Sequence, residues 1–228
     1  MPFTGSLVVE DWQRFMKRFR KFIYEDYGAR VRFIHSGEYG DKNQRPHYHA
    51  IIFGFDFKDK KLFKIKNGNK IYTSNYLSDR WGQGFCTVGD VNFTSAAYVA
   101  RYNMKKVYGD MAPEHYKRVW EDGSEYYVKP EYLTASKGIG RSWVLKYGFD
   151  EIWPDDFIVI ENRKLAVPDY YLRILEKADP VRFEKVKQNR REYLEANEED
   201  YTPERLAVRK EVFTHRISLL KRGLEDAT

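Results

Sequence analysis

Cysteine is nearly absent from this chain: Cys86 is the only one in 228 residues. A single cysteine excludes an internal disulfide and a cysteine cage for structural zinc. Long apolar runs are missing too, and the first residues do not form a signal peptide. We therefore expect a protein of a reducing compartment, the cytoplasm, without a membrane partner.

The charge of the chain is unevenly distributed. Residues 1–110 contain 19 Lys and Arg against 11 Asp and Glu, a net charge of +8, whereas the remainder has a net charge of −2. With 42% apolar and 17% aromatic residues, the chain is too hydrophobic to be disordered, and its length suits one core or one core plus an appendage. A basic first half favours a polyanionic partner, usually a nucleic acid, although ordinary surface charge would give the same count.

Two histidines lie in a segment that is typical of a β-strand, from Arg45 to Gly54. Because alternate side chains of a strand share a face, His47 and His49 point the same way. Residues 30–38 predict a second strand, joined to the first by a polar loop over 39–45, which places Glu38 near the histidines. Two imidazoles and a carboxylate form an open metal site. The alternative is two histidines close together by chance and an exposed carboxylate at the end of a hairpin.

A helix is expected from Thr94 or Ser95 through Val107. Its spacing places Tyr98 and Tyr102 on one face, together with Lys105 and Lys106. A phenol oxygen is a competent covalent nucleophile, and a lysine can stabilise charge on a phosphate. With a metal site, these groups could cut a phosphodiester and keep one end on the enzyme. Packed tyrosines with solvated hydroxyls are the alternative.

Elsewhere, apolar periodicity and breakers predict further elements. A helix over 10–27 has a basic stripe that is either a solvated or a phosphate-tracking face. The other elements expected are a loop or short hairpin over 56–70, a helix over 74–81, a strand over 85–91, a basic loop over 137–141, a hairpin over 157–167, a helix from Pro168, and two amphipathic helices over 180–223 that break near Thr202 and Pro203.

These motifs together resemble a known family. Arg45-Pro46-His47-Tyr48-His49, preceded by Glu38 and followed by the segment from Tyr98 to Lys106, is similar to the HUH endonuclease superfamily. Within it, the chain is most similar to replication initiators of microviruses, of the gokushovirus type and related to the phiX-type A protein. Residues 37–40 and 136–141 share this resemblance, which covers most of residues 5–175.

The resemblance implies an α+β fold, an antiparallel β-sheet with helices packed on one face and the histidines on a central strand, plus a C-terminal helical region. The expected division is a nuclease core over 1–110, an extension over 111–179 and charged helices over 180–228. The family has an apolar strand ahead of the region that begins here at Gly5. The sheet could then be incomplete, be completed by another segment, or belong to an N-terminally shortened reading frame, and we expect reduced stability or a rearranged sheet.

The implied activity is rolling-circle replication initiation, in which a tyrosine nicks and rejoins single-stranded origin DNA through a 5′-phosphotyrosine, with Mg²⁺ or Mn²⁺ bound. Host helicase and polymerase would be further partners, in the cytoplasm of a bacterial host. The implied site residues are, for catalysis, Tyr98, Tyr102, Lys105 and Lys106; for the metal, His47, His49 and Glu38; and for DNA contact, Arg45, Lys42, Arg101, Lys137 and Arg141.

Three alternatives to this activity stay open. The first is a DNA-binding protein with a vestigial site, and the second is a relaxase- or transposase-type HUH nuclease. The third is a metal-dependent hydrolase that uses activated water, in which the tyrosines are only structural.

Overall fold

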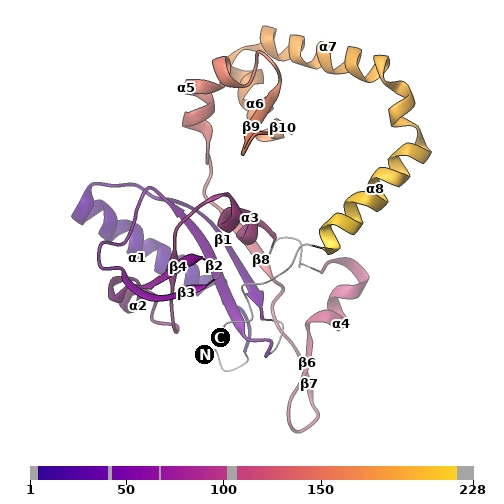
Figure 1. The fold of residues 1–228 in the computed structure, drawn as a ribbon. Coiled ribbons are helices and arrows are strands. Elements are labelled where there is room, and N and C mark those ends of the chain that lie inside the picture. The colour runs from indigo at the N-terminus through magenta and orange to yellow at the C-terminus, as the bar shows by residue number, and fades with distance from the viewer. Residues whose placement is uncertain (1–4, 41–42, 67, 102–106, 220–228) are drawn as a thin grey trace. The chain divides into compact units, whose positions relative to one another are not determined.

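The chain divides into two compact units, with the boundary between Ser136 and Lys137. A computed structural model describes residues 5–40, 43–66, 68–101 and 107–219 (Figure 1). The boundaries after residues 110 and 179 that the sequence suggested do not separate these units. Residues 132–135 form a strand that pairs with residues 34–37, which ties the segment after residue 110 to the first unit.

The first unit contains most of the strands. Its elements are α1 (Val9–Tyr27), β1 (Arg32–Tyr39), β2 (Pro46–Phe53), β3 (Lys61–Lys66), β4 (Asn69–Thr73), α2 (Asn75–Trp81), β5 (Val88–Gly89), α3 (Phe93–Arg101), the 3₁₀ turn η2 (Gly109–Met111), α4 (Ala112–Tyr116), β6 (Lys117–Val119), β7 (Glu125–Tyr127) and β8 (Tyr132–Ala135).

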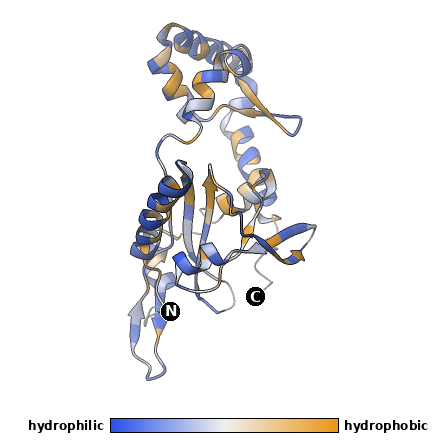
Figure 2. Ribbon diagram, turned by 90° about the vertical axis from the view of Figure 1, so that its left-hand side faces the viewer, coloured by the Kyte–Doolittle hydropathy of each residue, from blue (hydrophilic) through white to orange (hydrophobic). Residues whose placement is uncertain are grey.

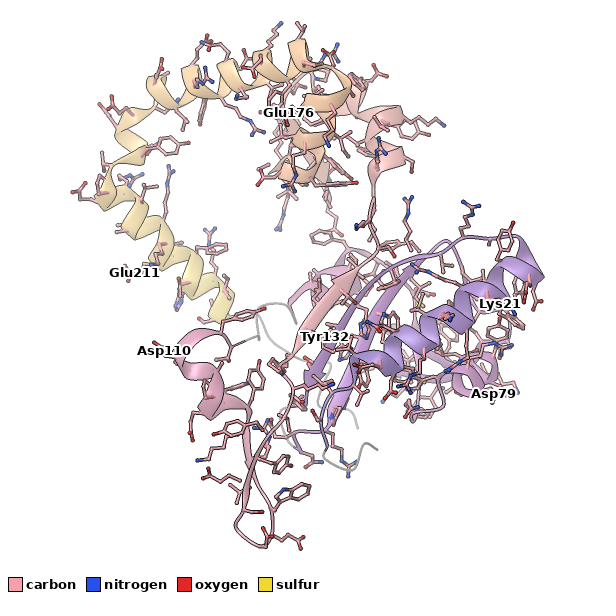
Figure 3. All side chains as sticks on the ribbon, turned by 180° about the vertical axis from the view of Figure 1, so that it is seen from behind. Lys21, Asp79, Asp110, Tyr132, Glu176 and Glu211 are labelled. Atoms are coloured by element: carbon pink, nitrogen blue, oxygen red, sulfur yellow. The ribbon has the colours of Figure 1, made fainter. Side chains whose placement is uncertain are left out.

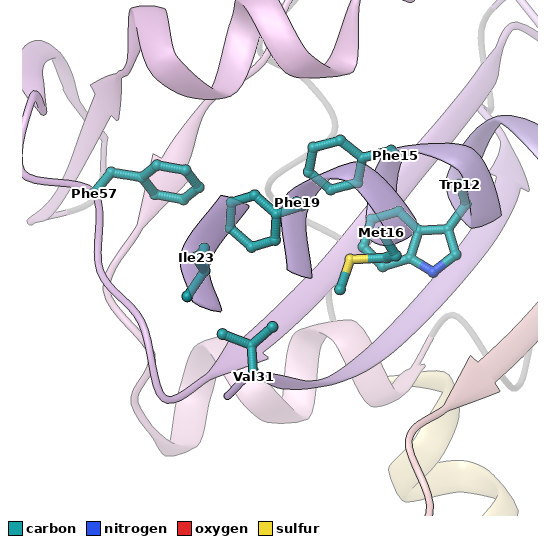
Figure 4. Packing of buried hydrophobic residues seen from close by; sticks show 7 residues of the cluster. All are labelled: Trp12, Phe15, Met16, Phe19, Ile23, Val31 and Phe57. Carbon is teal, nitrogen blue, oxygen red and sulfur yellow. The ribbon is translucent and has the colours of Figure 1, made fainter. Parts of the chain in front are cut away.

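Helix α1 supplies the main core of this unit. Its apolar residues recur every three or four positions and so form one buried stripe, and Gly28 ends the helix in the left-handed conformation, with φ of 61°. Figure 4 shows the buried cluster, which consists of Trp12, Phe15, Met16, Phe19, Ile23, Val31 and Phe57. Figure 2 shows many hydrophilic residues along α1, in keeping with its exposed basic stripe.

The sheet that α1 covers has three antiparallel strands in the order β2-β1-β8. The expected α+β class is therefore confirmed. The resemblance placed the histidines on a central strand, but among the described residues β1 is central and the histidine strand β2 is outermost. Residues 5–8 form no strand and lead directly into α1. Two tyrosines of the sheet hold this segment in place. The hydroxyl of Tyr39 accepts the N–H of Leu7, and the hydroxyl of Tyr48 accepts the N–H of Val8.

Two expected elements differ in length. The polar segment over 56–70 is a hairpin, β3–β4, and the expected strand over 85–91 is reduced to Val88–Gly89, which pairs with β4. Gly89 has no side chain to pack, which weakens this strand. The helix expected to reach Val107 is described as far as Arg101, and Val107 itself is not helical.

The second unit is mainly helical. Its elements are α5 (Arg141–Glu151), β9 (Phe157–Ile160), β10 (Arg163–Ala166), α6 (Asp169–Ala178), α7 (Pro180–Ala196), the 3₁₀ turn η3 (Glu198–Tyr201) and α8 (Pro203–Ser218). Thr202 caps α8 and Pro203 occupies its first turn, as expected from the sequence. Its buried core consists of Val144, Ile152, Trp153, Val167, Leu175 and Val186. Among the described residues of the whole chain, we find no helix with the length and apolar character needed to cross a lipid bilayer.

Candidate active site

The two histidines of β2 share the face of the sheet that points away from α1. In the register of β1 and β2, His47 lies opposite Glu38 and His49 lies opposite Ser36. His35, the residue before Ser36 in β1, points to the other face and stacks on Trp12 of α1 at 3.8 Å between ring centroids. The sheet therefore separates the histidine face from the α1 core, and the prediction that His47 and His49 share one face is confirmed.

Glu38 contacts one of the histidines directly. Its Oε1 lies 2.8 Å from Nε2 of His49, and the carboxylate is only 2% exposed, against 25% for the imidazole. The bond runs diagonally across the two strands, because the register partner of Glu38 is His47 rather than His49. The expectation that Glu38 meets the histidine strand is confirmed, and the alternative of an exposed carboxylate is wrong.

His47 is oriented by the backbone of the loop before it. Its Nδ1–H donates to the carbonyl of Arg45 at 2.8 Å, which leaves the lone pair on Nε2 available. Gly40 lies against the same ring: a Cβ at position 40 would stand 2.6 Å from Cε1 of His47. The imidazole is thus held between a carbonyl and a residue without a side chain.

The donor set fits a divalent cation, although the side chains are not gathered into a cage. Within the residues that the structure describes, no group of three or more His, Cys, Asp or Glu side chains lies close enough to hold one metal ion. The rings of His47 and His49 are 6.5 Å apart and inclined by 22°. The 2.8 Å between His49 and Glu38 is close to the separation of neighbouring ligand atoms on an octahedral ion, roughly 3 Å for bonds of about 2.1 Å.

A buried hydroxyl on the same face also lacks a partner. Ser36 is 1% exposed, and its Oγ has no hydrogen-bond partner among the described residues. It lies opposite His49 in the strand register. A buried polar atom without a partner costs free energy unless something else satisfies it. The Oγ of Ser36 could therefore form a hydrogen bond with a water molecule on a bound cation.

The helix that contains Tyr98 lies beside the histidine strand. Helix α3 contacts β2. It lies in front of the sheet in Figure 1, whereas α1 lies in front of the sheet in Figure 3, which shows the molecule from behind. The backbone of Tyr98 is therefore on the histidine side of the sheet. Three further catalytic candidates lie outside the described residues, namely Tyr102, Lys105 and Lys106.

The residues expected to contact DNA are divided between the two units. Arg45 is exposed beside the histidines, and Arg101 ends helix α3. Lys42 lies outside the described residues. Lys137 and Arg141 are exposed at the start of α5, in the second unit. The basic stripe of α1 is on the opposite side of the sheet from the histidines, so it cannot line the same site.

Two buried titratable residues near the site were not singled out from the sequence. His35 is fully buried, and burial, followed by the influence of His49, lowers its pKa to about 3. Glu131 is 8% exposed, and its Oε1 accepts the backbone N–H of Tyr39 at 3.0 Å. The pairing of β8 with β1 brings Glu131 next to Tyr39, and no local sequence motif predicts that pairing.

Comparison with known proteins identifies a family for the segment that contains the histidines. Residues 4–107 match the family described as "Replication-associated protein ORF2/G2P". This part of the chain belongs to that family. The match includes both histidines, Glu38 and both candidate tyrosines, so all proposed metal and nucleophile positions lie inside it.

Three curated replication-associated proteins of phages align with most of the chain. It is 30% identical to replication-associated protein ORF2 of Spiroplasma virus 4, over 75% of this chain and 52% of the relative. It is 31% identical to replication-associated protein VP4 of Bdellovibrio phage phiMH2K, over 76% of this chain and 53% of the relative. It is 31% identical to replication-associated protein ORF4 of Chlamydia phage 1, over 72% of this chain and 40% of the relative.

The chain therefore spans about half the length of the curated relatives that it matches. No solved structure matches it. The family assignment rests on sequence, and the site geometry rests on the structure described above.

Proposed function

We propose that this protein initiates rolling-circle replication of a phage genome by nicking and rejoining single-stranded DNA at its origin. The observation that carries the proposal is the position of α3, which contains Tyr98, on the histidine side of the sheet and in contact with β2. Membership of residues 4–107 in a family of replication-associated proteins supports the same role.

The reaction needs a nucleophile that stays attached to the DNA. The phenol oxygen of Tyr98 or Tyr102 would attack the scissile phosphate, lose its proton, and form a new P–O bond to the tyrosine. The P–O3′ bond breaks, and the leaving 3′ oxygen takes up a proton to become a 3′-hydroxyl that can prime synthesis. Attack by a 3′-hydroxyl on the phosphotyrosine reverses the change and rejoins the strand.

His47, His49 and Glu38 would hold Mg²⁺ or Mn²⁺, which supplies charge neutralisation at the phosphate when bound. The carbonyl of Arg45 orients His47 by accepting its Nδ1–H. Nε2 of His49 and Oε1 of Glu38 lie 2.8 Å apart, so a bound cation would take the place of the proton that these two atoms share. Lys105 or Lys106 would stabilise the negative charge that develops on the phosphate.

A covalent-adduct assay tests this proposal. The protein is incubated with end-labelled single-stranded DNA that contains the phage origin, with and without Mn²⁺, and resolved on a denaturing gel. We expect a protein–DNA adduct that requires the cation and is lost in the double variant Tyr98→Phe plus Tyr102→Phe. A matched control is Tyr108→Phe, because Tyr108 is exposed and lies just beyond the candidate pair.

Other outcomes of the same gel would refute the proposal. Cleavage without an adduct would instead indicate a hydrolase that activates water. Binding without cleavage would indicate a DNA-binding protein with a vestigial site. An adduct that persists in the double variant would show that another residue is the nucleophile.

A further inference from the structure

Strand β3 and the loop before β5 together expose a pair of aromatic side chains, Phe63 and Phe85. The side chains of Phe63 and Phe85 are 50% and 70% exposed, and their ring centroids lie 5.3 Å apart at an angle of 58°. Phe63 lies where the register of β3 and β4 shifts, between Leu62 and Lys64. Such a bulge redirects a side chain, and here it brings Phe63 against Phe85 on the surface.

The β3–β4 hairpin is strongly basic. Between Asp59 and Asp79 there are five lysines and no acidic residue. One of them, Lys60, forms ion pairs with Asp56 and Asp90. The other four lie along the hairpin that contains Phe63, and they are Lys61, Lys64, Lys66 and Lys70.

Lys64 shows how close the two kinds of side chain lie. Its Nζ is 5.5 Å from the centre of the Phe63 ring. Aromatic faces that stack bases, interleaved with lysines that pair with phosphates, are the features that hold single-stranded nucleic acid without reading its sequence. A large apolar patch on a protein surface generally marks an interaction site. The uniform positive charge selects a polyanion as its partner.

We propose that Phe63, Phe85 and the surrounding hairpin lysines form a binding surface for single-stranded DNA, separate from the histidine face. Bases stack on the two phenylalanines, and phosphates pair with the lysines. This inference rests on the proposed function for the identity of the nucleic acid, and it adds a second contact that holds the strand outside the reaction site.

A second hairpin in the same unit provides a matched control. The β6–β7 hairpin also exposes aromatic side chains: Tyr127 is 63% exposed, and Trp120 stacks on Tyr126 at 4.3 Å. However, residues 117–127 contain three acidic and two basic residues. Its surface would therefore repel phosphates, which predicts that its aromatic residues do not contribute to DNA binding.

The test measures binding separately from cleavage. Fluorescence anisotropy with a labelled oligothymidylate of about 20 nucleotides, without divalent cation, compares the full chain with Phe63→Ala plus Phe85→Ala and with Tyr127→Ala. We expect the double variant to bind at least tenfold more weakly, and Tyr127→Ala to bind within about twofold of the parent. Phe63→Trp keeps a stacking surface and should retain the affinity.

The lysines predict a salt effect. Replacing Lys61 and Lys70 by Gln should flatten the slope of log affinity against log salt by about 1.4, because each single-strand phosphate contact contributes about 0.7. Thermal melting, followed by circular dichroism, shows whether each variant is folded. If the double alanine variant does not fold, Phe63→Trp and the double lysine variant still test the surface.

Several results would overturn this inference. The parent could fail to bind the oligothymidylate, the double variant could bind as tightly as the parent, or Tyr127→Ala could lose as much affinity. Self-association lost in the double variant, with DNA binding unchanged, would assign the surface to a protein partner instead. Binding that depends on Phe63 and Phe85 but leads to no adduct would refute the proposed nicking while leaving this surface intact.

Discussion

The stability of the first unit should depend on pH through a single buried histidine. His35 has no exposed surface, stacks on Trp12, and has no hydrogen-bond partner for Nε2 among the described residues. Burial first, and the nearby His49 second, lower its pKa from an ordinary value of 6.5 to about 3. The folded chain therefore keeps His35 neutral at pH values where the unfolded chain protonates it.

The sign of the effect follows from this difference. Between a pH of about 6.5 and about 3, the unfolded state binds a proton that the folded state does not, so the free energy of unfolding falls as the pH falls. The contribution is fully present above the unfolded pKa. Each pKa unit corresponds to about 1.36 kcal/mol, so lowering the pH from about 7.5 to about 5 should remove about 2 kcal/mol.

Urea denaturation of the parent and His35→Gln at these two pH values measures that contribution. Glutamine is polar and of similar size but does not titrate, so His35→Gln should lose about 2 kcal/mol less than the parent on acidification. His115→Gln, which changes an exposed histidine, is the control and should follow the parent. Equal acid sensitivity of the parent and His35→Gln would refute the assignment to His35.

Three further substitutions test packing around the site and in the second unit. Gly37→Ala would place a Cβ 2.6 Å from Cε1 of Tyr132, labelled in Figure 3, so urea denaturation should show a loss of about 1–3 kcal/mol; unchanged stability would contradict this packing. Gly40→Ala would displace the His47 ring, so the Mn²⁺ concentration for half-maximal adduct formation should rise roughly tenfold with little change in melting temperature. Asp179→Ala removes the side chain that caps α7 and should lower the free energy of unfolding by about 1 kcal/mol, measured by thermal melting. Asp179→Asn, measured in the same way, should retain most of the stability.

Local pattern was sufficient for much of the fold. The spacing of Trp12, Phe15 and Phe19 predicted α1, and the alternation along β2 predicted that His47 and His49 share one face. Glu38 was placed near the histidines because a hairpin brings its strand ends together. Thr202 and Pro203 identified the start of α8, since capping depends only on neighbouring residues.

Long-range pairing was not readable in the same way. Strand β8 joins β1 from far along the chain, and only this contact brings Glu131 beside Tyr39 and moves the unit boundary to Ser136. The residues of β8 show no periodicity that distinguishes this partner from others. The roles of Tyr98 and Tyr102 stay predictions, because they depend on side-chain positions rather than on the course of the backbone.

The carbonyl of Arg45 accepts two hydrogen bonds, from Nδ1 of His47 and from the N–H of Gly40. One backbone oxygen thus closes the hairpin connection and fixes the tautomer of an imidazole proposed to bind the cation. Grafting a connection of different length between β1 and β2 would therefore retune cation affinity without altering any ligand.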